Sequence, residues 1–213
     1  MAELKNRFDS IIFDLDGTLW DSTANVAEAW QTAAGKVDYI KDAITVASVR
    51  SITGMPYDAI FEKLFPKISS EQREEFKSLA ARHELDTLNT KGGDIYPGVA
   101  ETLQYLQSRY KLFIVSNCQS GYIENFLKMD NMAGFFIGHQ CYGTKGQQKW
   151  QNITDVVQDH HLTAPVYVGD TMGDYNASVK ASVPFIFAAY GFGEVNEDQL
   201  ATLDTFGQLK NIL

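Results

Sequence analysis

The chain has 213 residues, of which 45% are hydrophobic and 21% charged, proportions that are normal for a globular protein. Its net charge of −9 argues against a nucleic acid or an anionic membrane as partner, because phosphate-rich surfaces attract clustered lysine and arginine. No segment approaches the roughly 18–20 apolar residues of a membrane span, the first residues show no secretory signal, and two cysteines are too few for a disulfide framework, so we expect a cytoplasmic protein.

The first predicted element is a strand at residues 10–13, a short β-branched and aromatic run typical of a strand buried on both faces. Asp14 and Asp16 follow it directly, and two residues at this spacing point the same way along the pleat. Gly17 allows a sharp turn after them. Ionised carboxylates at the end of a buried strand are costly without a positive partner, and a divalent metal ion is the simplest one. The alternative is an aspartate-rich turn that caps the strand.

Helices are predicted next, over residues 22–34, 43–52, 56–65 and 69–88, with Ser22 or Thr23 as the first N-cap. No strand is expected between residues 20 and 91. This pattern predicts an all-helical block of about 70 residues, inserted directly after the aspartate loop. Residues 91–98, which contain three glycines and a proline, are the predicted hinge.

The remainder alternates between strands and helices. Strands are predicted at 111–117, 135–138, 165–168 and 183–188, and helices at 99–109, 121–129, 149–161 and 176–181, with a turn and a helix in 197–213. This alternation indicates an α/β fold with a Rossmann-like, parallel, five-stranded sheet and helices on both faces. We therefore divide the chain into an α/β core of residues 1–19 and 92–213 and an α-helical cap of residues 20–91.

Three of the predicted strands end in polar side chains. In parallel sheets of this kind, ligands bind at the carboxyl ends of the strands. The polar residues at these ends are Asp14 and Asp16, Ser116 and Asn117, and Asp170 and Asp174. Turn chemistry alone does not account for three such ends, so we expect one functional site at this edge of the sheet.

Four segments in order resemble the motifs of the haloacid dehalogenase superfamily of phosphohydrolases. They are the Asp-Leu-Asp-Gly-Thr of residues 14–18, the Ile-Val-Ser-Asn of residues 114–117, Lys149 at the start of a helix, and residues 169–174. The second and third motifs are weak singly, but the ordered set, with a helical insertion after the first, is specific. The resemblance covers nearly the whole chain and is closest to the phosphoglycolate phosphatases, whose α-helical cap the block at 20–91 resembles.

The resemblance implies roles for these residues. Asp14 would be the nucleophile that forms an aspartyl-phosphate, and Asp16 the general acid and base. Mg²⁺ would be held by the Asp14 carboxylate, the Asp16 backbone carbonyl and Asp170, with Asp174 either a further ligand or a partner of the ligands. The predicted catalytic and substrate-binding residues that complete the site are Ser116, Asn117 and Lys149. Lys145 could replace Lys149 in its role, although a loop lysine in contact with solvent is the simpler interpretation.

The cap is expected to select the substrate. Residues 49–57 resemble the substrate-facing cap loop of this group, so Arg50 and Tyr57 are candidates for binding the leaving group. Hinges near residues 19–21 and 92–97 would let the cap close and exclude bulk water.

The expected function is a magnesium-dependent phosphatase for a small, soluble phosphomonoester, phosphoglycolate or a related metabolite, with the protein a monomer or a homodimer. Two alternatives stay open. One is a phosphotransferase similar to the β-phosphoglucomutases, although this chain carries Val26 and Tyr57 where those proteins carry a histidine and an arginine. The other is a phosphate-sensing or partner-binding module without catalysis, for which an acid/base residue such as Asp16 would have no use.

Overall fold

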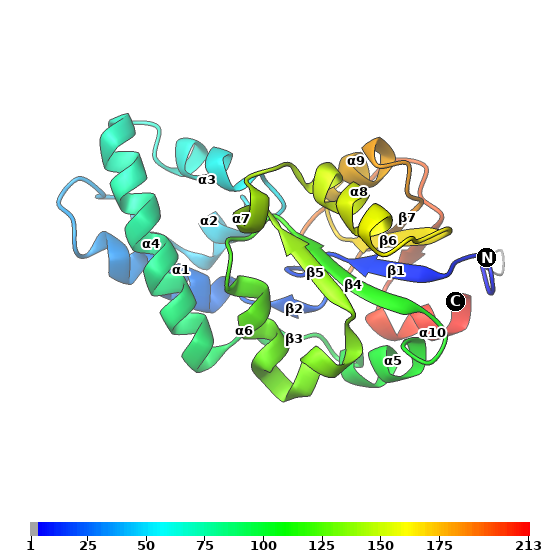
Figure 1. Ribbon diagram of the computed structural model, residues 1–213. Coiled ribbons are helices and arrows are strands. Elements are labelled where there is room, and N and C mark those ends of the chain that lie inside the picture. The colour runs from blue at the N-terminus through cyan, green and yellow to red at the C-terminus, as the bar shows by residue number, and fades with distance from the viewer. Residues whose placement is uncertain (1–3) are drawn as a thin grey trace.

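The structure is a computed structural model that describes residues 4–213, apart from the side chains of Tyr57, Asp58 and Asp130. Its centre is a parallel sheet in the order β5-β4-β1-β6-β7-β8 (Figure 1). The strands are β1 (Ser10–Phe13), β4 (Lys111–Ser116), β5 (Gly138–Cys141), β6 (Pro165–Gly169), β7 (Phe185–Ala188) and β8 (Ala201–Leu203). The prediction of an α/β fold is confirmed, but the sheet has six strands rather than five. The additional strand, β8, has only three residues, too few to show a strand pattern.

Strand β1 lies between β4 and β6, and this position determines where the site forms. Phe13, the last residue of β1, pairs in parallel register with Ile114 of β4 and Val168 of β6. The carboxyl ends of these three strands are therefore adjacent, at the point where the strand order changes direction. The backbone N–H of Asp14 continues this pairing, because it donates to the carbonyl of Val168 at 2.8 Å.

Helices cover both faces of the sheet, as predicted. The core helices are α5 (Val99–Leu106), α6 (Tyr122–Lys128), α7 (Tyr142–Lys145), α8 (Lys149–Asp159), α9 (Met172–Lys180) and α10 (Leu209–Ile212). Side chains alternate along β1: Ile12 packs with Ile153 of α8, whereas Ile11 packs with Leu103 of α5. Figure 1 shows α8 and α9 on one face, and α5 and α10 on the other. This two-faced burial explains the continuous apolar run of β1.

One strand begins later than predicted. Phe135 ends a 3₁₀-helix (Met129–Phe135), and β5 starts only at Gly138. The ring of Phe136 packs in the core instead, because it contacts those of Phe13 and Phe126 at centroid distances of 6.3 Å. Ile137, directly before β5, is exposed, so hydrophobicity is here a poor signal of strand position.

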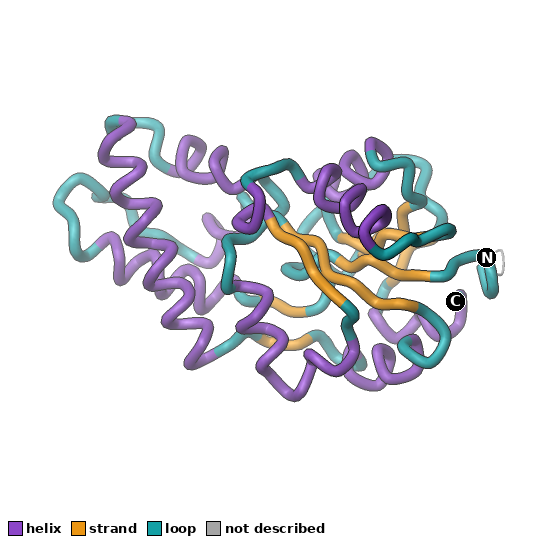
Figure 2. The backbone as a smooth tube through the Cα atoms, viewed as in Figure 1, coloured by secondary structure: helices purple, strands orange, loops and turns teal. Residues whose placement is uncertain are grey.

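Four helices follow the first strand: α1 (Thr23–Ala34), α2 (Val46–Arg50), α3 (Tyr57–Leu64) and α4 (Ser70–Lys91). They form the part called the helical cap below, which Figure 2 shows as a group of helices beside the sheet. Aromatic side chains hold it together: Phe61 of α3 packs against Trp30 of α1 and Phe76 of α4. The division of the chain into cap and core at residues 20 and 91 stays a prediction.

The two connections between cap and core pair with each other. β2 (Trp20–Asp21) and β3 (Asp94–Ile95) form an antiparallel two-stranded sheet. The expectation that no strand occurs between residues 20 and 91 is therefore wrong at β2. A strand of two residues is too short to show a periodic pattern in the sequence. The predicted hinge segments lie side by side, so that they would bend together.

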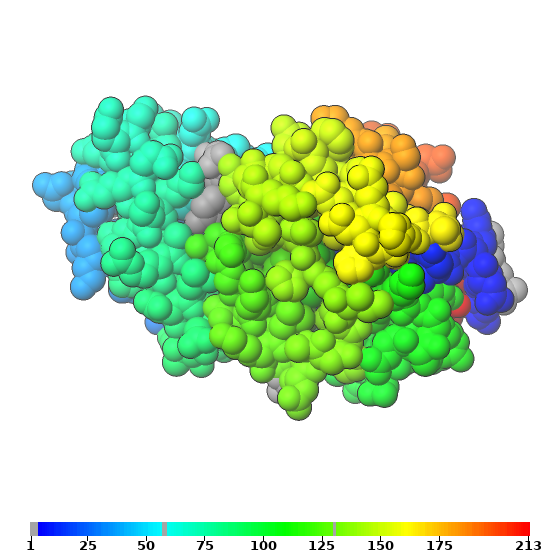
Figure 3. All heavy atoms as spheres, viewed as in Figure 1, coloured from blue at the N-terminus to red at the C-terminus, as the bar shows by residue number. Residues whose placement is uncertain are grey.

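The cap rests on the core in this structure, and Figure 3 shows the two surfaces in contact. Asn117 of the core donates from Nδ2 to the carbonyl of Gly54 at 3.1 Å, and Asn125 donates to that of Leu85 at 3.1 Å. Among the described residues, no helix combines the length and the apolar character that a membrane crossing requires.

Candidate active site

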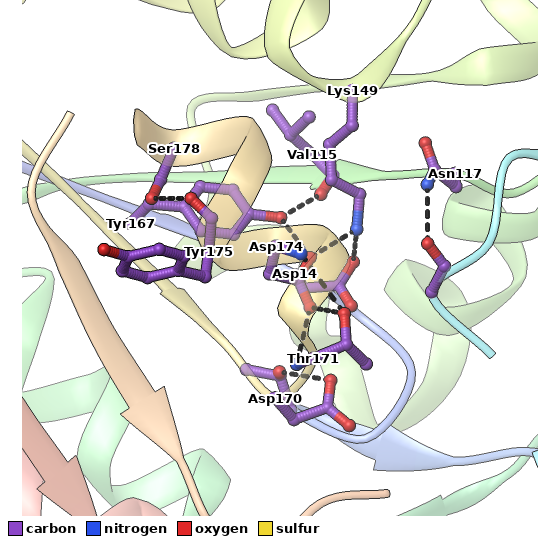
Figure 4. A network of polar contacts seen from close by, with 12 residues as sticks. Asp14, Val115, Asn117, Lys149, Tyr167, Asp170, Thr171, Asp174, Tyr175 and Ser178 are labelled. Carbon is purple, nitrogen blue, oxygen red and sulfur yellow. Dashed lines mark hydrogen bonds and ion pairs between the residues drawn. The ribbon is translucent and has the colours of Figure 1, made fainter. Parts of the chain in front are cut away.

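The site is built around a buried lysine and two carboxylates. Lys149 Nζ lies 2.9 Å from Oδ1 of Asp14 and 2.6 Å from Oδ1 of Asp174, as Figure 4 shows. The side chain of Lys149 is 4% exposed, and the two acids are equally buried. Lys149 is the first residue of α8. The N-terminus of a helix carries a partial positive charge, so the helix does not stabilise a cation at this position. The lysine is held by the two acids instead.

Asp174 is fixed by the start of α9. Thr171 is the N-cap of this helix, and its hydroxyl accepts from the backbone N–H of Asp174 while Asp174 Oδ2 accepts from the backbone N–H of Thr171 at 3.0 Å. This reciprocal capping box orients the carboxyl group. Tyr167 OH lies 2.9 Å from the carbonyl of Val115 and 3.3 Å from Oδ1 of Asp174, so these two acceptors share its one proton. Both oxygens of Asp174 are therefore occupied by protein donors.

Asp170 keeps more of its acceptor capacity. Its Oδ2 accepts from the backbone N–H of Phe192 at 2.8 Å, and Thr18 lies 3.5 Å from its Oδ1. Gly17 packs so closely here that a Cβ on it would lie 2.1 Å from Oδ2 of Asp170. The glycine of the first motif, at φ +81°, is thus required both by the turn and by the approach of Asp170.

Asp14, Asp170 and Asp174 form the one group of this kind that we find among the described residues. Each offers a carboxylate oxygen within 4.8 Å of the others, and all three are buried. Oxygen donors of this type suit a hard divalent cation such as Mg²⁺. The donor set therefore fits the magnesium ion that the sequence predicts. The side chain of Asp16 lies outside the group.

Burial and neighbouring charges change the pKa values of Asp14, Asp170 and Lys149. Burial, and next the charge of Asp174, raise the pKa of Asp14 to about 7, and Lys149 opposes this shift. Burial also raises the pKa of Asp170 well above its ordinary value. For Lys149, burial acts to lower the pKa, but the charges of Asp14 and Asp174 outweigh it, so its pKa lies above the ordinary value. Lys149 is a permanent cation, and a second positive charge would stabilise the acids further.

Asp16 turns toward the cap side of the site. Its Oδ1 accepts from Ser22 Oγ at 2.7 Å and from Tyr122 OH at 2.9 Å. Burial raises the pKa of Asp16, and the hydrogen bonds from Ser22 and Tyr122 oppose that shift. Ser22 is at the predicted N-cap position of α1, but its hydroxyl makes no cap bond. That hydroxyl orients Asp16 instead.

A cavity of about 80 Å³ joins core and cap above these residues. The core contributes Asp14, Asp16, Ser116, Asn117, Cys118, Tyr122 and Lys149. The cap contributes mainly apolar side chains, namely Val26, Trp30, Val49, Ile52, Met55 and Ile60, together with the carboxyl group of Glu84. The cavity therefore has one charged end and one largely apolar end.

Not every predicted site residue lines this cavity. Arg50 Nη2 lies 2.7 Å from Oδ2 of Asp21, and its guanidinium lies over the ring of Phe192. Arg50 thus lines a second cavity, between the cap loop and α9. Tyr57 was the other cap candidate, and its side chain lies outside the described residues. Lys145 is exposed and paired with Asp155 at 2.6 Å, whereas Lys149 reaches Asp14.

Several residues of the site were not predicted from the sequence. Tyr122 lies on α6 and Glu84 on α4, each far along the chain from the aspartates, and neither belongs to a motif. Tyr167 lies within β6, where its ring is buried in the core while its hydroxyl reaches Asp174. A polar group in an otherwise apolar strand is the only signal that the sequence offers for it.

The chain is similar to known proteins in both sequence and fold. The sequence model of the haloacid dehalogenase-like hydrolase family matches residues 11–188. A phosphoglycolate phosphatase from Vibrio cholerae is 30% identical over 199 residues, with 85% of this chain and 84% of that protein covered. A phosphoglycolate phosphatase from Aquifex aeolicus is 28% identical over 196 residues, with 87% of each covered. A solved haloacid dehalogenase-like hydrolase from Streptococcus pneumoniae shares the fold, with a TM-score of 0.83 at 21% identity over 96% of this chain and 98% of that one.

Proposed function

The chain belongs to the family of haloacid dehalogenase-like hydrolases and is a phosphatase of that family, and we propose that it hydrolyses a small phosphomonoester through a phosphorylated Asp14. The observation that carries this proposal is that Asp14 lines the cavity and is held there by Lys149. Oδ1 of Asp14 is held by Lys149, whereas Oδ2 accepts no hydrogen bond from the described residues. Oδ2 is therefore the oxygen available to attack phosphorus.

In the first step, Oδ2 of Asp14 forms a bond to phosphorus as the bond from phosphorus to the ester oxygen breaks. The leaving alkoxide takes a proton from Asp16, whose raised pKa suits a general acid. In the second step, the ionised Asp16 removes a proton from water, and that water attacks phosphorus. The bond between phosphorus and Asp14 then breaks, and inorganic phosphate leaves with both residues restored.

The other residues of the core hold charge and orient groups. Lys149 compensates the negative charge of Asp14 and of the phosphoryl oxygens. Ser116 lines the cavity at the end of β4 and would donate its hydroxyl to a phosphoryl oxygen. Asn117 also lines the cavity, although its amide holds the cap at Gly54, so we assign it to cap closure as well as to substrate binding.

Asp14 and Asp170, with the backbone carbonyl of Asp16, would bind the magnesium ion. Such an ion supplies charge that offsets the repulsion between the substrate dianion and the carboxylates. Asp174 has both oxygens engaged, and we propose that it mainly positions Lys149 beside the metal site. These assignments rest on the oxygen donors of the three buried aspartates.

The substrate would be a small phosphorylated metabolite, and phosphoglycolate is one candidate because it is the substrate named for the bacterial relatives. A phosphotransferase similar to the β-phosphoglucomutases is less well supported. Val26 lines the cavity where those proteins carry a histidine, and its side chain cannot transfer a proton. Arg50 extends to Asp21 rather than into the cavity.

Phosphate release from a panel of small phosphomonoesters, with and without magnesium, tests the proposal. We expect release that depends on magnesium, stops on chelation with EDTA and resumes when the metal is restored. Absence of release from every ester, in protein shown by titration calorimetry to bind magnesium, would contradict it. Transfer of the phosphoryl group to a second position of a sugar phosphate, rather than to water, would favour the phosphotransferase.

A further inference from the structure

Glu84, which the mechanism does not use, is a carboxyl group from the cap that lines the same cavity as Asp14 and Asp16. It is 3% exposed and lies on α4. Two donors hold it in place: Trp30 Nε1 donates to Oε2 at 2.6 Å, and Gln119 Nε2 donates to Oε1 at 2.7 Å. A buried acid held in this way faces whatever part of the substrate extends beyond the phosphoryl group.

The cap end of the cavity has no positive charge to offer. Of the cavity-lining side chains that the structure describes, only Lys149 is cationic, and it already contacts Asp14 and Asp174. Arg50, on the cap loop, pairs with Asp21 and stacks over Phe192 in the other cavity. A carboxylate on the leaving group would therefore enter a buried site with no cation to compensate it.

Glu84 makes that site still less favourable for an anion. Burial raises the pKa of Glu84 to about 7, so the side chain is a neutral acid or an anion near neutral pH and is never a cation. Each carboxylate oxygen accepts one hydrogen bond from the protein and has further lone-pair capacity. A hydroxyl or amino donor on the substrate would use that capacity, whereas a second carboxylate would be repelled.

From this arrangement we propose that the cap cavity selects an uncharged, partly apolar leaving group that donates a hydrogen bond to Glu84, and that it disfavours a leaving group carrying a carboxylate. The inference rests on the proposed phosphatase function and specifies its substrate class, and it ranks phosphoglycolate below uncharged esters among the candidate substrates. The apolar side chains that line the same cavity as Glu84, Ile52 and Ile60 among them, favour an apolar carbon skeleton in the leaving group.

A matched pair of esters tests this. 2-Phosphoglycolate and 2-hydroxyethyl phosphate differ only in a carboxylate against a hydroxymethyl group. At pH 8, above the pKa of Glu84, we expect kcat/KM for the hydroxyethyl ester to exceed that for phosphoglycolate by about tenfold or more, which corresponds to about 1.4 kcal/mol. Equal or better hydrolysis of phosphoglycolate would overturn the inference and leave the phosphatase function intact.

The variant Glu84→Gln tests the residue itself. Glutamine keeps the size and an acceptor but removes the charge, so we expect the preference for the hydroxyethyl ester to fall by at least about threefold through a gain on phosphoglycolate. Asp86→Asn removes an exposed acid from the same helix and should leave the preference unchanged. An unchanged preference in Glu84→Gln would remove Glu84 from the proposal.

The experiment also separates two kinds of failure. The wild-type ratio alone decides whether carboxylates are disfavoured, so the test holds even if Glu84→Gln does not fold. If neither ester, nor the activated substrate acetyl phosphate, releases phosphate with magnesium present, the phosphatase function itself fails. Release from acetyl phosphate and phosphoglycolate, but not from the hydroxyethyl ester, overturns only the inference about the leaving group.

Discussion

The ammonium nitrogen of Lys149 lies 2.9 Å from Oδ1 of Asp14, a residue 135 positions earlier in the chain. The same nitrogen contacts Asp174, so one buried cation serves two buried acids. Coulomb attraction at these distances is strong inside a protein, because little water screens it. The contact links the residue after β1 to the first residue of α8.

Replacing Lys149 with methionine should therefore lower both stability and activity. Asp14 and Asp174 would remain buried without a cation, and we expect the free energy of unfolding to fall by about 3–5 kcal/mol at pH 7 in metal-free protein. Urea denaturation measures this, and phosphate release should fall with it. Lys145→Met removes an exposed lysine and is the control. Equal urea midpoints for Lys149→Met and the wild type would show that the pair does not stabilise the fold.

Replacing Asp14 with asparagine should abolish covalent chemistry. An amide oxygen is a poor nucleophile, so we expect phosphate release to fall by at least about 10³-fold. Acid quenching with labelled substrate should trap phosphate on the wild-type protein and none on Asp14→Asn. The control Asp9→Asn changes an acid at the opposite end of β1, next to Thr163, and should keep the label. Trapped phosphate on Asp14→Asn would assign the nucleophile to another residue.

Replacing Asp16 with asparagine should separate the two chemical steps. Loss of a general acid or base costs roughly 10²–10⁴-fold in rate. p-Nitrophenolate leaves without a proton, so this variant should still release about one equivalent of p-nitrophenol in a burst and then stall, because no base activates water. Rapid-mixing absorbance records the burst. A full steady-state rate in Asp16→Asn would exclude the acid/base role of this residue.

Closure of the cap should depend on Gly54. A Cβ at this position would lie 2.7 Å from Oγ1 of Thr171, and the residue has φ +82°. We expect Gly54→Ala to hold the cap away from the core and to lower kcat/KM by about tenfold or more. Gly98 has φ +80° and no atom within 4 Å of an added Cβ.

The variant Gly98→Ala is therefore a matched control for backbone strain. It should cost about 1–2 kcal/mol of stability and leave kcat/KM unchanged. If both variants lose activity equally, strain rather than contact with Thr171 is the cause, and the prediction for cap closure is wrong.

Glu84 should make stability depend on pH. Its pKa is about 7 in the folded protein against an ordinary value of 4.5, because burial disfavours the charged form. The folded state therefore holds this proton more tightly than the unfolded state. The stabilisation of the folded state by this bound proton is fully present below about pH 4.5 and is lost as the pH rises through 7.

The variant Glu84→Gln does not titrate, so it isolates this contribution. We expect the difference in unfolding free energy, wild type minus variant, to decrease by about 3 kcal/mol at most between pH 5 and pH 8. Urea denaturation of both proteins across this range measures it. A difference that stays constant with pH would show that the pKa of Glu84 is not raised.

The sequence predicted the core of this fold through local patterns. The run at residues 10–13 was apolar on both sides of the pleat, and β1 is buried on both faces. The alternation of strands and helices identified the parallel sheet, since each pattern depends on side chains a few residues apart. The strands that the sequence did not predict are short. β2 has two residues and β8 has three, too few to show a periodic pattern.

The candidate site, like the fold, was predicted only in part. The sequence showed polar residues at the ends of β1, β4 and β6. Because ligands bind at the carboxyl ends of strands in parallel sheets, these residues were expected to form one site. The sequence favoured Lys149 over Lys145, four residues earlier, and in the structure Lys149 contacts Asp14 whereas Lys145 pairs with Asp155. It also made Arg50 a candidate for binding the leaving group, whereas the structure pairs Arg50 with Asp21.

By itself, then, the sequence determined the order of strands and helices, the strand ends that carry carboxylates, and the family. Only the tertiary structure decided that Lys149 joins Asp14 to Asp174, that Ser22 and Tyr122 orient Asp16, and that Glu84 enters the cavity from the cap. The physical reason is the distance along the chain between the residues that make contact. Local patterns reflect contacts within a few residues, whereas the charge and shape of this cavity arise from side chains that meet only after the cap has packed on the core.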